Sequence, residues 1–253
     1  MMPATSPAAA TTLHTILDRL SDAERPFFLL GEDASPVNAE AIMDDAWFDE
    51  QVRLRGLIWG IDDRFTLGTL WWFSASHWLI LPTLASMLLT DQVLSPRLAD
   101  VTLHWRSDSR LPGATSAAVV DGDGVEELGA TLDAVIGVLA SRLGRGERRL
   151  WALAVDSLTN RLLWLGAATG QLGRAQAMAV DLVAALDRPG VPAPRFTTLR
   201  DLPEGVRDVW VRRGSCCLVS RVPGHGSCAD CPRQTPAERE ARLRERALTG
   251  GDH

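Results

Sequence analysis

The sequence contains no lysine and no tyrosine, so all 26 of its basic residues are arginines. We interpret this absence as codon bias of the source genome, because the abundance of Ala, Gly and Arg fits the same bias. The 32 acidic residues leave a formal net charge of −6. Overall charge therefore excludes broad attraction to nucleic acids or to anionic membranes.

The N-terminus lacks the layout of an export signal. Residues 1–12 are small and polar, and the first arginine is Arg19, so no basic segment precedes an apolar one. We predict a disordered leader over residues 1–12 and a cytoplasmic protein. Thiols in that reducing compartment seldom form structural disulfides.

Charge is also missing from one apolar run. Residues 67–89 contain no Asp, Glu or Arg over 23 positions, which is long enough to span a membrane. His77, Pro82 and five Ser or Thr hydroxyls interrupt this run. We predict a central core helix bent at Pro82, and peripheral contact with the inner membrane stays open.

Periodicity along the chain predicts an α+β fold that is predominantly helical, with a small antiparallel sheet. Residues 101–106 alternate between apolar and polar side chains, as in a half-buried strand, and residues 117–120 can return beside it after a turn at 111–113. This predicts a β-hairpin near residues 100–120. Apolar stripes at helical spacing predict helices, listed by range: 13–30, 39–59, 128–143, 150–165 and 175–186.

A Pro- and Gly-rich linker and a helix-start pattern help to divide the chain into four parts. The Pro- and Gly-rich residues 189–194 form the clearest linker, and short strands are expected at 196–199 and 209–211. Thr235, Pro236 and Glu238 have the pattern of a helix start, which leads into an Arg- and Glu-rich helix. The predicted parts are a leader (1–12), a mainly helical domain (13–194), a C-terminal cysteine segment (195–233) and a charged helical tail (234–253).

The sequence has only four cysteines: Cys216, Cys217, Cys228 and Cys231. They fall within 16 positions, in the order Cys-Cys, ten residues, Cys, two residues, Cys. Such clustering is a poor way to crosslink a fold of this size, and a good way to build a soft-ligand site for iron–sulfur or zinc.

The spacing leaves three interpretations of the cysteines. Zinc usually takes two Cys-x-x-Cys-like pairs, and only Cys228 and Cys231 have that spacing. A two-iron cluster is wider and needs two thiolates per iron, so it accepts ligands splayed by neighbouring Cα positions. In an ideal strand Cys216 and Cys217 point to opposite faces, so the backbone must turn there. Disulfides or unliganded thiols would need another compartment.

Other residues near the cysteines were weighed as parts of the site. His225 lies between the two cysteine pairs, but a Rieske-like centre needs two histidines, so we assign it no ligand role. Five arginines flank the cysteines and would suit an anionic centre, although each one alone is also typical of an ordinary surface; they are Arg207, Arg212, Arg213, Arg221 and Arg233.

The cysteine motif resembles the C-terminal signature of the FhuF-like ferric-siderophore reductases. The matching run is residues 211–217 (Val-Arg-Arg-Gly-Ser-Cys-Cys), the ten-residue spacer and residues 228–231. Residues 70–90 resemble that family's Trp-rich, Pro-broken helix, and residues 150–165, with Asn160, resemble its later Trp-containing helix. The resemblance covers about two-thirds of the chain and is most specific at the cysteines.

The resemblance implies an enzyme with one [2Fe–2S] cluster that reduces the Fe(III) of an imported siderophore, often of the hydroxamate type. The four cysteines match the family's cluster ligands one by one. Trp210, Arg212 and Arg213 adjoin these ligands and are our candidates for substrate contacts. Residues 121–127 lack a complete dinucleotide fingerprint, so an external donor such as a ferredoxin or flavoprotein is expected.

Two other classes of function stay open from the sequence. One is a non-enzymatic protein with a four-cysteine zinc site that serves partner binding. The other is a cluster-bearing redox or iron sensor. A sensor that acts on DNA would carry a basic recognition helix, whereas the Arg-rich tail helix here is balanced by Glu, and we expect no nucleic-acid partner.

Overall fold

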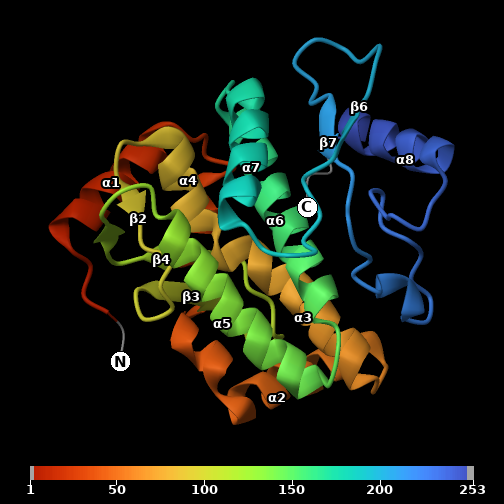
Figure 1. Cartoon of the computed structure of the whole chain (residues 1–253), viewed down its shortest axis with the longest axis horizontal. Helices are drawn as coiled ribbons and strands as arrows, with labels where there is room; N and C mark the ends of the chain where they lie inside the picture. Colours follow the sequence, from red (N-terminus) through yellow and green to blue (C-terminus); the bar gives the residue numbers. More distant parts are fainter. Residues whose placement is uncertain (1–2, 250–253) are drawn as a thin grey trace.

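Helix α6 (Glu147–Ala168) runs through the middle of the fold, and α3 (Arg64–Leu79) and α7 (Leu172–Leu186) pack on it (Figure 1). The computed structural model describes residues 3–249. α6 is buried on nearly all sides because its apolar residues are not confined to one stripe. The indole Nε1 of Trp72 on α3 donates to the Leu150 carbonyl oxygen of α6 at 2.9 Å, so a buried polar group is satisfied at the contact.

The other elements surround these three helices and confirm a predominantly helical α+β fold with small antiparallel sheets. The remaining helices are α1 (Pro7–Asp18), α2 (Asp45–Trp59), α4 (Leu81–Leu89), α5 (Val125–Leu143) and α8 (Pro236–Thr249), with 3-10 turns η1 (Arg25–Phe28) and η2 (Ala39–Met43). The strands are β1 (Ser35–Asn38), β2 (Val93–Leu94), β3 (Val101–Trp105), β4 (Gly113–Ser116), β5 (Val119–Val120), β6 (Phe196–Thr198) and β7 (Val209–Val211). They form a three-stranded sheet in the order β1-β3-β4 and two-stranded sheets β2-β5 and β6-β7.

The apolar run at residues 67–89 lies inside the protein. It forms α3 and α4, which meet at Ile80, and Pro82 stands in the first turn of α4, where its missing N–H is tolerated. By length and composition alone Arg64–Leu89 passes as a membrane span, yet 78% of its apolar window is buried in the fold. The prediction of a bent core helix is therefore confirmed, and this burial is compatible with a soluble protein.

The expected leader is wrong for residues 7–12, which form the first part of α1. Ser6 caps the helix by accepting from the Ala9 backbone N–H at 3.2 Å, and Pro7 occupies the first helical position. Ala9 and Thr12 are buried, so this helix belongs to the core. Residues 1 and 2 of the expected leader lie outside the described residues.

The expected hairpin is right in its first strand and wrong in its second. β3 pairs with β4 at Gly113–Ser116, directly after the turn, rather than with residues 117–120. Val119–Val120 instead forms β5 and pairs with β2. Gly113 explains the early return: a Cβ there would lie 2.2 Å from the Phe27 carbonyl oxygen, so only glycine brings the strand this close to η1.

β3 is the middle strand of its sheet, between β1 and β4, and His104 is buried although the alternation placed it on the polar side of a half-buried strand. Pro36 of β1 and Gly113 of β4 lie opposite His104, which is 1% exposed. Neither of its ring nitrogens has a hydrogen-bond partner within the described part of the chain. Burial lowers the pKa of His104 to about 4.

Acid should therefore destabilise the fold through His104. The unfolded chain takes up this proton near pH 6.5 and the folded one only near pH 4, so stability is lost as the pH falls between these values. At roughly 1.4 kcal/mol per pKa unit, we expect a loss of about 3 kcal/mol at pH 4. Urea unfolding of wild type and His104→Leu at pH 7 and pH 4 would measure it.

The matched control for that experiment is His14→Leu, because His14 is exposed on α1. The His104→Leu variant should lose part of the acid sensitivity, and the His14→Leu variant should keep all of it. Equal pH dependence in all three proteins would contradict a neutral, buried His104.

Candidate metal centre

The four cysteines lie in a long loop between β7 and α8 (Figure 1). β7 pairs with β6, and its Val209 and Val211 pack against Leu163 of α6, so the start of the loop is anchored to the core. In the described residues 212–235 the 3-10 turn η3 (Val219–Arg221) is the only regular element. The cysteines therefore depend on side-chain contacts rather than on a backbone ladder for their positions.

The backbone bends on both sides of the adjacent cysteines. Gly214 and Ser215 bend before them, as the sequence predicts, and Leu218 follows in the left-handed region with a φ of 72°. Cys216 and Cys217 are both buried as a result. The turn thus removes the obstacle that an extended chain would place between neighbouring ligands.

Each member of the adjacent pair faces one member of the Cys-x-x-Cys pair. Cys217 interacts with Cys228, and Cys216 with Cys231, and the cysteines lie 4.1–4.3 Å from one another. All four thiols are free. Among residues 3–249 no three His, Cys, Asp or Glu side chains already surround one point as around a bound ion. The four thiols form two close pairs, which is compatible with metal or cluster binding.

A fully buried arginine contacts the Cys217–Cys228 pair of thiols. Arg213 is 2% exposed, and its Nη1 lies 3.3 Å from Cys228 Sγ and 3.7 Å from Cys217 Sγ. The same guanidinium lies over the Phe73 ring and 3.6 Å from the carboxylates of Asp156 and Asp230. Burial opposes its charge, but Asp230, the two thiols and Asp156 together raise the pKa of Arg213.

Asp156 fixes the loop to the central helix. This α6 side chain accepts from the backbone N–H of Gly214 at 2.8 Å and of Ser215 at 3.2 Å, directly before the first cysteine. Burial raises the pKa of Asp156 to about 6, against the opposing effect of Arg213 and the two backbone donors. The carboxylate is thus the link that sets the cysteine loop on α6.

The thiols differ in how readily they lose a proton. Hydrogen bonding from Cys228 lowers the pKa of Cys217, and the Arg213 guanidinium acts in the same direction. The same bond, with burial, raises the pKa of Cys228. Burial raises the pKa of Cys216, although its sulfur accepts from the Leu218 backbone N–H at 3.4 Å. Of these three thiols, Cys217 is therefore the one most ready to become a thiolate ligand.

These groups fit a sulfur-bound anionic centre. Four thiolates around iron or zinc leave negative charge, and a cation and backbone N–H groups aimed at sulfur stabilise it. Arg213 supplies the cation and Leu218 an N–H. In the described chain, Nε and Nη2 of Arg213 are buried without hydrogen-bond partners, and Nε lies 3.6 Å from Asp156 Oδ2, so Nη2 is left as an unused buried donor of the site.

The three residues predicted to contact substrate do not share one surface. Trp210 is buried on the face of β7 that packs against Leu199 and Leu243. Arg213 is buried behind the thiols, so its role there is towards the cysteines rather than towards a bulky chelate. Arg212 is exposed between them, and its contact with a substrate stays a prediction. His225 is exposed and stands against the Trp59 ring, 4.6 Å between centroids.

Sequence reasoning missed both carboxylates of the site. Asp156 interrupts the apolar stretch 150–166 of α6, and a lone acid in such a stretch was a usable signal for a buried partner. Asp230 stands inside the Cys-x-x-Cys pair, where its pairing with Arg213 depends on the folded loop. That contact joins residues 17 positions apart across a loop of irregular shape, which no local pattern encodes.

The fold and the site define a mainly helical α+β protein with a clustered four-cysteine site in its C-terminal loop. Comparison with family models and with curated proteins finds no match to this chain. The function is therefore argued from the chemistry of the site and from the resemblance of its motif.

Proposed function

We propose that this protein is a cytoplasmic iron–sulfur reductase that reduces siderophore-bound Fe(III) to Fe(II), with Cys216, Cys217, Cys228 and Cys231 as ligands of a [2Fe–2S] cluster. The observation that carries the proposal is the pair of thiol contacts beside the buried Arg213. The resemblance of the cysteine motif to the FhuF-like reductases supports the same assignment.

The spacing of the cysteines supports two irons over one zinc ion. Each thiol pair combines one adjacent cysteine with one Cys-x-x-Cys cysteine, and a two-iron cluster would take two thiolates per iron. A single zinc ion usually takes two Cys-x-x-Cys-like pairs, and this chain has one such spacing, at Cys228 and Cys231. When bound, the cluster would supply one-electron chemistry: an electron from an external donor, such as a ferredoxin or flavoprotein, would pass to chelated Fe(III).

One electron is enough to release the iron. Siderophores hold Fe(III) with hard oxygen donors, and these donors bind the softer, less charged Fe(II) far more weakly. The residues of this chain then have two tasks. Arg213 and Asp156 hold the cysteine loop and balance its charge, and the surface beside the loop has to receive the ferric chelate.

Anaerobic purification followed by absorption spectroscopy and by iron, zinc and sulfide analysis tests the cofactor. We expect a red-brown protein with two irons and two sulfides per chain. The dithionite-reduced protein should be reoxidised by a ferric siderophore, which separates a reductase from a sensor. Zinc without sulfide would support a structural zinc protein and sink the proposal.

Ligand identity is tested by Cys228→Ser with Ser215→Ala as the matched control in the same loop. The serine variant should lose most of the visible absorption, because a hydroxyl is a poor substitute for a thiolate on iron. The alanine variant keeps all four thiols and should keep the spectrum. A full spectrum in Cys228→Ser would overturn the ligand assignment.

A further inference from the structure

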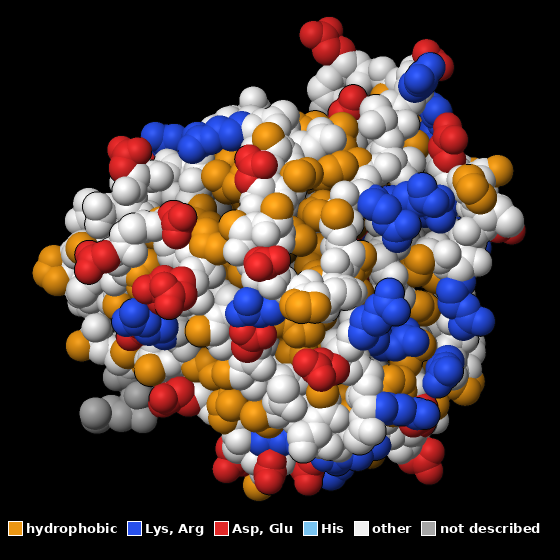
Figure 2. Space-filling model, viewed as in Figure 1, with side chains coloured by type: hydrophobic (Ala, Val, Ile, Leu, Met, Phe, Trp, Pro, Cys, Tyr) orange, Lys and Arg blue, Asp and Glu red, His pale blue; other side chains and the backbone are white. Residues whose placement is uncertain are grey.

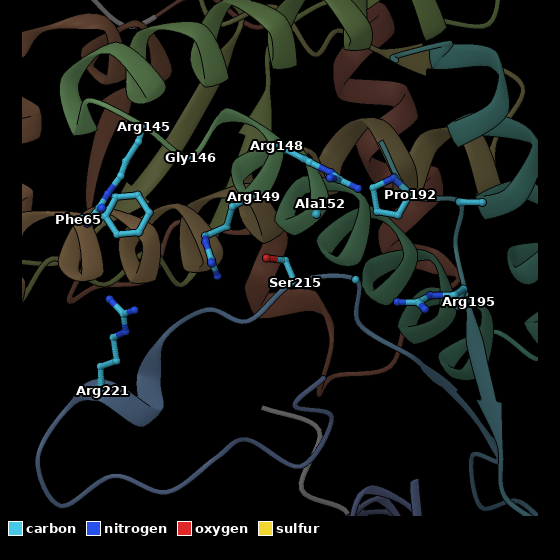
Figure 3. A pocket seen from close by; sticks show the side chains of 12 residues that line it. Phe65, Arg145, Gly146, Arg148, Arg149, Ala152, Pro192, Arg195, Ser215 and Arg221 are labelled. Carbon is cyan, nitrogen blue, oxygen red and sulfur yellow. The ribbon is translucent and has the colours of Figure 1, made fainter. Parts of the chain in front are cut away.

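A pocket of about 820 Å³ opens beside the cysteine loop (Figure 3). Its wall includes Gly214 and Ser215, the two residues directly before Cys216. The other walls are the start of α6, the coil around Pro192 and the η3 turn. A molecule in this pocket would therefore lie next to the proposed metal centre.

Five arginines line the pocket, and no acidic residue among the described ones does. They come from three separate segments: Arg145 just before α6 with Arg148 and Arg149 in its first turn, Arg195 after the coil, and Arg221 on η3. Arg149 and Arg221 point into the same space from opposite sides (Figure 3). Arginines gather on this part of the surface although the whole chain carries a net charge of −6 (Figure 2).

Among the described residues, Arg221 is the one pocket arginine with a carboxylate within ion-pair distance, 4.0 Å from Asp63, and the other four contact neutral groups or none. Arg149 Nη1 donates to the Cys216 carbonyl oxygen at 2.8 Å, and Arg195 Nη2 donates to the Arg213 carbonyl oxygen at 3.3 Å. Arg145 lies 4.5 Å from the centroid of the Phe65 ring. The Arg148 side chain makes no ion pair or hydrogen bond with the described residues 3–249. The pocket thus holds an excess of positive charge.

Two of these arginines stand where a helix disfavours them. Arg148 and Arg149 are in the first turn of α6, at the positive end of the helix dipole. Free backbone N–H groups at that end add to the attraction for anions. Both arginines are unfavourable for the stability of the helix, and both line a pocket. Residues that oppose local stability in this way indicate a functional site.

We propose that this pocket binds the ferric substrate, and that the substrate is an anionic chelate with carboxylate or catecholate oxygens rather than an uncharged trihydroxamate. The inference rests on the proposed reductase function and specifies its substrate class. Guanidinium groups pair bidentately with such oxygens. A neutral complex would leave the positive charge of the five pocket arginines uncompensated. Arg149 would then contact both the substrate and the cysteine loop, since it also donates a hydrogen bond to the Cys216 carbonyl oxygen.

The chemical step balances as a single electron transfer. The external donor is oxidised by one electron and Fe(III) in the chelate is reduced to Fe(II), so the charge of the bound complex becomes more negative by one. No bond to the protein forms. Release follows because Fe(II) is held weakly by the same oxygens.

Gallium(III) complexes test the pocket without any redox chemistry, because Ga(III) has the charge of Fe(III) and is not reduced. Calorimetry should show tight binding of a gallium tricatecholate or citrate complex, weakened by raising salt from 50 to 200 mM. An uncharged gallium trihydroxamate should bind at least about tenfold more weakly. The Arg148→Gln/Arg195→Gln double variant should lose about tenfold or more in affinity for the anionic complexes.

The matched control is Arg19→Gln, because Arg19 is an exposed residue at the C-terminal end of the distant helix α1, and this variant should bind as wild type does. The melting temperature of the double variant should be unchanged or raised, because one of its changes removes a cation from the start of α6. Equal affinity for the uncharged complex, or for metal-free citrate, would overturn the assignment. Wild-type affinity of the double variant for the anionic gallium complexes would also overturn the assignment.

Failure of the two proposals can be told apart. The Cys228→Ser variant should bind the gallium tricatecholate as wild type does, because Cys228 does not line the pocket. If the protein carries a cluster and reduces uncharged chelates while anionic gallium complexes fail to bind, the inference on substrate class is wrong and the reductase function stands.

Discussion

Replacing Arg213 with methionine is expected to destabilise the metal-free protein by about 3–5 kcal/mol, the typical effect of removing one partner from a buried ion pair. The change leaves Asp156 and Asp230 buried without their cation. Methionine fills a similar volume, so the loss of unfolding free energy comes from the missing charge rather than from a cavity. Urea unfolding at pH 7 measures it.

Arg212→Met is the control, because the neighbouring Arg212 is exposed and should cost little. Adding Asp230→Asn to Arg213→Met should recover part of the loss, since one buried carboxylate then no longer needs a cation. Wild-type stability in the Arg213→Met protein would contradict a charged, paired Arg213. In the loaded protein the same variant should lower the reduction potential, because the cation favours the more negative reduced state.

Loading the centre is expected to slow tryptic cleavage after Arg221 by roughly a hundredfold. Arg221 is exposed in the cysteine loop, which has little regular structure of its own. A crosslink that closes a loop of about 15 residues contributes roughly 3 kcal/mol in the chain-entropy account, close to a factor of a hundred. A metal centre that joins Cys216 to Cys231 closes a loop of that size.

Timed digestion of the loaded and chelator-stripped forms, followed by mass spectrometry of the fragments, measures the protection. Arg200 lies exposed outside the cysteine loop, so cleavage after it should proceed at the same rate in both forms. Equal rates after Arg221 in the two forms would mean that the loop is held by Arg213 and Asp156 alone.

Much of the fold follows from local patterns, and the errors arise where contacts between distant segments decide the structure. Apolar stripes predicted α5, α6 and α7, and alternation predicted β3. The start of α1 was missed because Ser6 and Pro7 give a weak cap signal that needs core contacts to become a helix. The second hairpin strand was misplaced because its register depends on the contact of Gly113 with Phe27, which is far away in the sequence.

The sequence by itself determined the ligand chemistry: four thiols at one end of the chain, and a spacing that demands a turn between neighbours. Only the tertiary structure decided which thiols face each other, that Arg213 is buried against them, and that Asp156 of α6 holds the loop. It also brought arginines from three segments around one pocket. The physical reason is that residue type fixes which atoms can bind a metal or an anion, whereas burial and distance, which set their charge and their strength, exist only once separate elements have packed together.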